Sequence, residues 1–184
     1  MKDLNLLTVT LSEITAGNHS EETLKKTINE IAKFFAENLN LNNDEVAILL
    51  TDKDKEVLSF AAPEYLVNSG LIPTNSSDAF ASIVFTLDKK AIDNNFNQQK
   101  HLNLFEFIKT PENKIKQIWK MLATTIKVDG EKLGVLELSK KGETILEAGD
   151  DFTNEDLDFV VNAMEKLAPF IKKVMPVNFR GKLT

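Results

Sequence analysis

Two histidines are the side chains of this 184-residue chain best suited to acid–base or metal chemistry, because imidazole titrates near neutral pH. His101 lies in a polar stretch beside a short apolar run, and His19 precedes a helix start. Neither has a second histidine or a group of carboxylates at the spacing of a metal site or a catalytic triad. We therefore interpret both as exposed or locally bonded side chains, and we expect no metal site and no catalytic residue.

Glycine and cysteine patterns exclude further chemistry. The seven glycines are scattered, and none has the GxGxxG spacing of a phosphate-binding loop. The chain has no cysteine, which excludes disulfides, thiolate nucleophiles, zinc ribbons and thioether-linked chromophores. These patterns leave no phosphate-binding glycine loop and no thiol chemistry.

Glu137 is a carboxylate inside an otherwise apolar strand. Alternation along the strand sends Val135 and Glu137 to one face and Leu136 and Leu138 to the other. If the leucines pack under helices, Glu137 faces the opposite side of the sheet. There it either accepts a hydrogen bond from a ligand or lies at a wet sheet edge. The same alternation assigns Thr125 to one face of the preceding strand.

A hairpin must position these two side chains. Leu122–Val128 and Leu133–Ser139 are apolar runs, and Asp129-Gly130 between them supplies the positive φ values that a two-residue turn requires. A capped amphipathic helix follows the hairpin. Its expected N-cap is Thr153, and Asp156 three residues later completes a pair that resembles a capping box.

Apolar periodicity and turn residues predict the other elements. The expected helices span 4–14, 20–39, a segment from Ser76 or Ser77 to 87, and a last helix after Thr153 with an apolar stripe over 157–171. Short helical pieces are expected at 104–108 and 115–119. The expected strands span 46–50, 57–61 and 91–93. Pro169 predicts a kink or an end of the last helix, and 177–184 are expected to form a loose tail.

Strands arranged in hairpins predict an α+β fold with a mainly antiparallel sheet and flanking helices, rather than a doubly wound parallel sheet. We assign residues 1–19 to an N-terminal helix, 20–172 to one domain and 173–184 to a C-terminal tail. The chain is 42% apolar and 27% charged, which is typical of a globular protein.

Charge and hydropathy exclude two classes of partner. The net charge of −6 argues against nucleic acid and anionic membranes, which require clustered Lys and Arg. No apolar run approaches the ~20 residues that span a bilayer. The first 17 residues lack a basic segment followed by an apolar block, so no signal peptide is expected and a cytoplasmic location is predicted.

The order of hairpin, loop and capped helix over 121–160 resembles the C-terminal half of a GAF domain, and a weaker resemblance extends over residues 20–172. The resemblance implies a central antiparallel sheet of five to six strands. It also implies terminal helices on one face and, on the other face, a pocket capped by loops and helices. A GAF domain is a sensory and regulatory module, so the resemblance implies ligand binding without catalysis.

The resemblance also implies which residues enclose the pocket. The candidate ligand-binding residues are Phe80, Asp93, Phe96, Phe105, Trp119, Thr125 and Glu137. Core packing is the alternative for most of the aromatic residues, and turn formation is the alternative for Asp93. The indole N–H of Trp119 requires a partner if it is buried.

Some GAF domains that bind cyclic nucleotides carry the motif NK…FxxxDE. Lys140, Phe152 and Asp156 match it, whereas Ser139 and Leu157 do not. The resemblance therefore implies a structural salt bridge between Lys140 and Asp156, and it argues against cyclic nucleotide binding.

Other cofactors of the family are disfavoured as well. Bilin attachment and methionine sulfoxide reduction require cysteine, and haem requires an axial ligand for which only the two histidines exist. The identity of the ligand is left open.

The leading hypothesis is a stand-alone cytoplasmic GAF-like domain that binds a small molecule and signals through association. Its partners would be a second copy, packed through the apolar stripes of residues 4–14 and 157–171, or a signalling protein. The alternative is a structural or interaction module whose pocket is filled by its own phenylalanines. An enzyme would require two acidic side chains that converge in one cleft.

Overall fold

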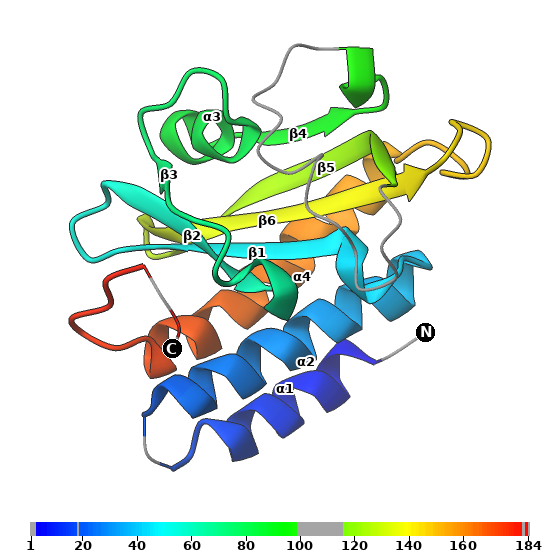
Figure 1. Cartoon of the computed structure of the whole chain (residues 1–184). Helices are drawn as coiled ribbons and strands as arrows, with labels where there is room; N and C mark the ends of the chain where they lie inside the picture. Colours follow the sequence, from blue (N-terminus) through cyan, green and yellow to red (C-terminus); the bar gives the residue numbers. More distant parts are fainter. Residues whose placement is uncertain (1–2, 18, 99–115, 182, 184) are drawn as a thin grey trace.

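The computed structural model describes residues 3–17, 19–98, 116–181 and 183, which form the predicted α+β fold (Figure 1). A six-stranded antiparallel sheet has the strand order β3-β2-β1-β6-β5-β4. The strands are β1 (Val46–Thr51), β2 (Val57–Ala62), β3 (Ile72–Pro73), β4 (Lys90–Asp93), β5 (Gln117–Val128) and β6 (Glu131–Gly142). The helices are α1 (Leu4–Ile14), α2 (Glu21–Leu39), α3 (Phe80–Leu87) and α4 (Asn154–Val174).

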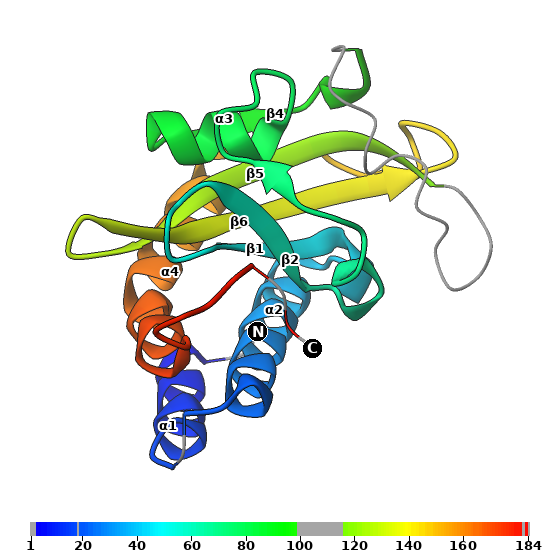
Figure 2. The same ribbon diagram turned by 60° about the vertical axis from the view of Figure 1, so that its left-hand side comes forward.

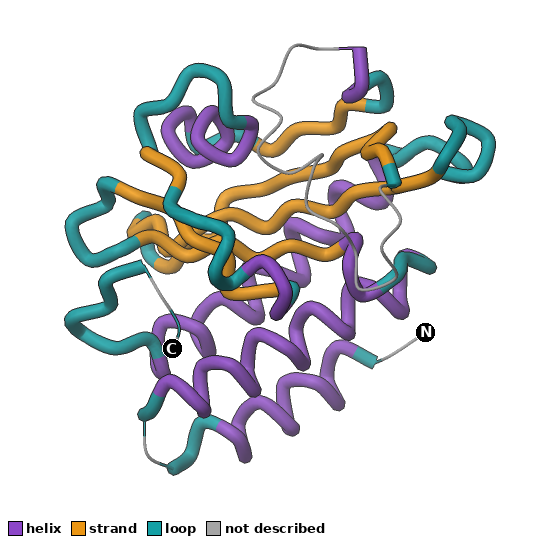
Figure 3. Tube along the Cα trace, in the orientation of Figure 1, coloured by secondary structure: helices purple, strands orange, loops and turns teal. Residues whose placement is uncertain are grey.

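The helices are divided unequally between the two faces of the sheet. The helices α2 and α4 pack on one face, and α1 packs on the outer side of α2 and α4 (Figure 2). The short helix α3 lies on the other face, over β5 and β6 (Figure 3). We call the first face the helix face and the second the α3 face.

The β5–β6 hairpin is confirmed and is longer than predicted. Asp129 and Gly130 have φ values of 52° and 80°, so both turn residues are in the left-handed region that such a turn requires. The prediction of a helical piece at residues 115–119 is wrong for the described positions, because β5 begins at Gln117. Residues 117–119 form a strand because Gln117 pairs with Gly142 of β6, so a distant segment determines their conformation.

Helix α4 begins as predicted and ends later than expected. The Thr153 side chain accepts a hydrogen bond from the backbone N–H of Asp156 at 3.1 Å, and the Asp156 carboxylate accepts one from the N–H of Thr153 at 2.8 Å. The helix continues through Pro169 to Val174, so of the two predicted alternatives an end at the proline is wrong, and a kink there stays a prediction.

The N-cap of α3 was also predicted incorrectly. The cap is Ala79, which makes no side-chain capping bond. Ser76 and Ser77 instead bond to Asp78 in the turn before the helix, at 3.4 and 3.1 Å. The predicted helical piece at 104–108 lies outside the described residues.

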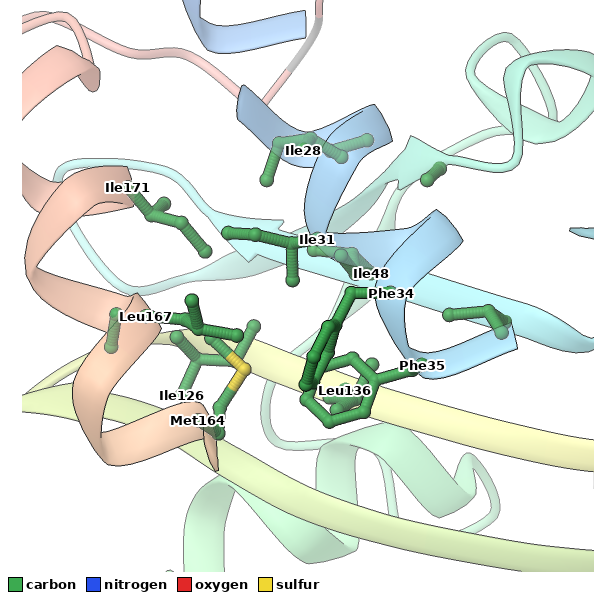
Figure 4. Packing of buried hydrophobic residues seen from close by; sticks show 14 of the residues in the cluster. Ile28, Ile31, Phe34, Phe35, Ile48, Ile126, Leu136, Met164, Leu167 and Ile171 are labelled. Carbon is green, nitrogen blue, oxygen red and sulfur yellow. The ribbon is translucent and has the colours of Figure 1, made fainter. Parts of the chain in front are cut away.

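One continuous apolar cluster fills the helix face (Figure 4). Its labelled members come from α2, α4 and the strands beneath: Ile28, Ile31, Phe34, Phe35, Ile48, Ile126, Leu136, Met164, Leu167 and Ile171. The rings of Phe34 and Phe35 meet edge to face, with their centroids 5.4 Å apart.

The C-terminal segment belongs to the same cluster, which contradicts the predicted loose tail. Phe179 and Leu183 are buried in the helix-face cluster, and the Phe179 carbonyl accepts a hydrogen bond from the N–H of Lys53 at 3.0 Å. The two apolar side chains gain burial that offsets the cost of ordering the segment. The domain limits at 19/20 and 172/173 remain a prediction.

Within the described residues, no helix is both long and apolar enough to cross a membrane.

Candidate functional site

The α3 face has Glu137 near its centre. Glu137 pairs with Ala47 of β1 on one side and with Ala123 of β5 on the other, and Ala123 pairs with Ala91 of β4. Residues paired directly across strands project to the same face of a sheet. The carboxyl group therefore stands in a row of three alanines that crosses four strands, and the methyl groups leave it without a bulky neighbour in that row.

Two separate apolar clusters flank this row. The α3 cluster consists of Leu49, Leu58, Phe60, Leu66, Ile72, Ala79, Ala81, Val84, Phe85, Ala123 and Val135. The Phe96 cluster consists of Phe96, Ile118 and Met121. Phe80 is partly buried against both clusters. Val135 precedes Glu137 by two residues on β6, and Met121 precedes Ala123 by two residues on β5. Glu137 therefore lies between the two clusters, and Ala123 of the row belongs to the α3 cluster.

The carboxyl group of Glu137 is buried without a described partner. Only 6% of the residue is exposed, and no hydrogen bond or ion pair joins its side chain to another residue that the structure describes. Burial raises the pKa of Glu137 to about 7, because desolvation disfavours the ionised form. The alternative of a wet sheet edge is wrong, since β6 lies between β1 and β5.

Glu45 is a second buried glutamate, equally exposed at 6%, and its environment is the reverse. Its carboxylate accepts hydrogen bonds from the backbone N–H of Asn42 at 2.7 Å, from the Asn42 side chain at 2.8 Å and from the N–H of Lys141 at 2.7 Å. Glu45 therefore fixes the entry to β1 against β6. The sequence analysis did not identify it, although Asn and Glu three residues apart are a capping-box signal.

Thr125 holds the end of α3. Its hydroxyl donates to the Val84 carbonyl at 3.2 Å, and the Lys132 ammonium donates to the carbonyls of Phe85 at 2.7 Å and Thr86 at 3.1 Å. A cation near the C-terminus of a helix is favourable because unpaired carbonyls concentrate negative charge there. The hairpin therefore anchors α3, and the analysis of the sequence missed the part played by Lys132.

The other predicted pocket residues have partners within the protein. Phe80 and Phe96 meet edge to face at 5.4 Å between ring centroids. The Asp93 carboxylate accepts from the Asn95 N–H at 2.9 Å, and the Trp119 indole N–H donates to the Gly142 carbonyl at 3.1 Å. Phe105 lies outside the described residues, as does His101.

The predicted ion pair between Lys140 and Asp156 is wrong. The Lys140 ammonium donates to the Asp150 carbonyl at 2.7 Å and lies 4.6 Å from the centroid of the Phe152 ring. Asp156 is engaged in the cap of α4. Lys120, which pairs with Lys140 across the strands, is buried and forms an ion pair with Asp151 at 2.7 Å.

A cavity of about 270 Å³ lies elsewhere, between the α3–β4 connection, β5 and α4. It is lined by Asp88, Lys89, Lys90, Thr124, Thr125, Lys127, Val161, Met164 and Glu165. Lys127 and Asp88 in its lining already form an ion pair at 2.7 Å, so part of its charge is neutralised. Thr125 is the predicted pocket residue that borders it.

No group of three or more His, Asp or Glu side chains suited to a metal ion occurs among the described residues.

Comparison with solved structures identifies this architecture as a GAF fold. The GAF domain of an Acinetobacter phosphoenolpyruvate-protein phosphotransferase is 16% identical with a TM-score of 0.63, over 94% of this chain and 95% of that chain. The second GAF domain of DevS from Mycobacterium smegmatis is 12% identical with a TM-score of 0.57, over 81% and 93%. A type II free methionine-R-sulfoxide reductase from Thermoplasma acidophilum is 14% identical with a TM-score of 0.58, over 84% and 96%.

At the level of sequence, no protein-family model matches this chain. No curated protein matches it either. The structural similarity confirms the predicted fold, and its low sequence identity leaves function to be argued from the residues of this chain.

Proposed function

We propose that this chain is a non-catalytic sensory domain that binds a small molecule on the α3 face, in contact with Glu137. The observation that carries the proposal is the buried carboxyl group of Glu137, which stands between alanines and has no partner in the described part of the chain. A buried polar group without a partner costs roughly 1–3 kcal/mol, so a bound ligand that pairs with it recovers that free energy.

The arrangement of carboxylates favours binding over acid–base catalysis. An acid–base site needs two groups that converge on the substrate. Glu45 is held by three hydrogen bonds, and the Asp93 carboxylate caps its own turn. The structural neighbours include free methionine-R-sulfoxide reductases, but this chain lacks the cysteine that the GAF resemblance implies for that chemistry.

The strands provide a physical route from the ligand to the helix face. Ala123 lies in the Glu137 row, whereas the adjacent Leu122 lies in the helix-face cluster against α4. A ligand that contacts the α3 cluster changes the packing of strands on which α4 rests, and it shifts the population towards the arrangement that it binds best.

We propose that the signal leaves the domain by association in the cytoplasm, either with a second copy or with a signalling partner. Leu6 and Val9 are one turn apart on the outer side of α1 and are 65% and 55% exposed. The same patch on two copies can pack around a twofold axis.

Light scattering tests this association. We expect a dimer mass for the wild type and a monomer mass for the double variant L6E/V9E. The variant V177E is the matched control, because Val177 is 91% exposed and lies outside α1. A monomeric wild type would exclude the homodimer, and association with a different signalling protein would then be the remaining proposal.

Native mass spectrometry of freshly purified protein tests ligand binding. We expect a small molecule to co-purify with the wild type and to be absent from purified E137A. If neither the purified protein nor a metabolite screen shows a bound small molecule, the alternative is favoured. That alternative is an interaction module whose α3 face is filled by its own aromatic side chains, for which the Phe80–Phe96 contact is the supporting observation.

A further inference from the structure

We infer that the ligand of the α3 face is a small organic cation, an amine, amidine or guanidine, whose N–H groups bind the Glu137 carboxylate. This inference rests on the proposed function and names the chemical class of its ligand. An ionised carboxylate is an acceptor only, so the group that completes it must donate hydrogen bonds. A cationic donor supplies both the bonds and the opposite charge.

Among the residues that the structure describes, the surroundings of Glu137 supply neither of these. Ala47 and Ala123 on the flanking strands carry no polar side-chain atom. On the same strand, Val135 is apolar, and the Ser139 hydroxyl donates to the Glu45 carbonyl at 3.3 Å. The ionised carboxylate repels an anionic ligand, and a ligand with acceptors alone would bind only the protonated acid, which is the major form below a pKa of about 7.

The other charged groups that the structure describes on this face are already engaged. Asp93 of β4 accepts from its own turn, and Glu45 before β1 accepts three hydrogen bonds. The ammonium of Lys132 from β6 is bound to the end of α3. Tyr65 from the turn after β2 is neutral at physiological pH, as a tyrosine ordinarily is, and burial raises its pKa further to about 12. Glu137 is therefore left to recognise the charged end of a ligand.

The shape of the face indicates the rest of the ligand. Glu137 lies between the α3 cluster, which includes Ala123 of the row, and the Phe96 cluster. The side chains of both clusters are apolar, and the hydroxyls of Thr125 and Ser139 on the same face are bound to backbone carbonyls, which suits a cation attached to a hydrocarbon or aromatic body. Phe80, which contacts both clusters, is placed to pack against such a body.

Proton linkage provides a signature of this recognition. A bound cation favours the ionised form of Glu137. Molecules in which the Glu137 carboxyl is protonated before binding must therefore release that proton when the cation binds. With a pKa of about 7 in the free site, affinity for a permanent cation falls about tenfold between pH 8 and pH 6. A neutral ligand that accepts from the protonated acid shows the opposite trend.

The experiment is a titration calorimetry and thermal-shift panel at pH 6, 7 and 8. The probes are small amines, amidines and guanidines, including benzamidine. Each is compared with a neutral amide and an acid of the same body, which for benzamidine are benzamide and benzoate. The proteins are the wild type, E137Q and E165Q. The last removes a carboxylate from the separate cavity beside α4 and is the matched control.

We expect at least one cation to bind the wild type and E165Q equally and to bind E137Q at least tenfold more weakly, with the stated pH trend. Preference for the neutral or acidic counterpart, loss of binding in E165Q alone, or binding by no cation would overturn the inference. A neutral or anionic molecule that co-purifies would overturn the cation class and leave the proposed function intact. Absence of any bound small molecule would remove both.

Discussion

The two faces of the sheet are built from the same strands and differ in how completely they are filled. The helix face has one continuous apolar cluster, which contains Leu136 and Leu138 of β6. The α3 face has two separate clusters, and Glu137 of the same strand lies between them. Alternate residues of β6 thus contribute to stability on the helix face and, in our proposal, to recognition on the α3 face. The stability of the helix face offsets the free-energy cost of burying the Glu137 carboxyl group on the other face.

The largest expected effect comes from the helix face. The variant F34A removes a fully buried ring that contacts Phe35 and Phe159, and it should lower the free energy of unfolding by about 3–5 kcal/mol. The variant F96A removes a ring from the small cluster on the α3 face and should cost less. Urea unfolding of both variants at pH 7 measures the difference. Equal losses would mean that the two faces contribute alike to stability.

The second effect is a dependence of stability on pH that belongs to the α3 face. The raised pKa of Glu137 means that the folded protein keeps a proton between pH 4.5 and about 7 that the unfolded chain has released. Stability therefore falls as pH rises through this window, by up to about 3 kcal/mol, and levels off above it. In the variant E137Q the glutamine does not titrate, so this loss of stability with rising pH is absent.

Urea unfolding at pH 5, 6, 7 and 8 should show the wild type losing stability relative to E137Q as pH rises. The matched control is E45Q, which weakens an acceptor of three hydrogen bonds and should be destabilising at neutral pH. Parallel pH profiles for the wild type and E137Q would show that Glu137 is ionised in the folded protein with a partner of its own.

A smaller effect is expected where the hairpin holds α3. The variant T125V removes the hydroxyl that donates to the Val84 carbonyl, and it should cost about 1 kcal/mol. Val84 keeps a backbone donor from Lys89, which limits the loss. Hydrogen exchange should show faster opening of α3 in T125V than in T124V, whose substitution is on the helix face of the same strand. Equal exchange in the two variants would contradict the anchoring role of Thr125.

The smallest effect is the coupling between Lys140 and Asp156. Because Lys140 bonds to Asp150 and Asp156 caps α4, a double-mutant cycle of K140A and D156A should give a coupling energy close to zero. A direct surface ion pair would give up to about 1 kcal/mol. A coupling energy of that size would support the predicted ion pair between Lys140 and Asp156.

Local signals in the sequence predicted much of this fold. The Asp129-Gly130 turn, the Thr153 cap and the alternation around Glu137 depend on neighbours within a few residues, so periodicity and turn chemistry were sufficient. The face to which Glu137 points followed from the adjacent leucines alone. Its burial also depends on β1 and β5, which pair with β6 from distant parts of the chain.

The features that the sequence did not predict depend on contacts between distant segments. Gln117 extends as a strand because Gly142 pairs with it, and Phe179 is ordered because the helix-face cluster buries it. Lys132 and Thr125 were separated from α3 by some 40 residues, so no local pattern could link them to its carbonyls. Lys140 was assigned by motif, whereas its geometry is set by the loop before α4.

The alternation in β6 has a consequence for how this protein can change over evolutionary time. Inserting or deleting one residue between Gly134 and Ser139 would exchange the two sets of side chains, placing a carboxylate under α2 and α4 and leucines beneath α3. The length of this strand is therefore constrained by its pattern, and Gly134 is constrained by space, because a Cβ there would lie 1.9 Å from the Leu49 carbonyl oxygen. Length variation among descendants should instead concentrate in the loop at residues 143–149.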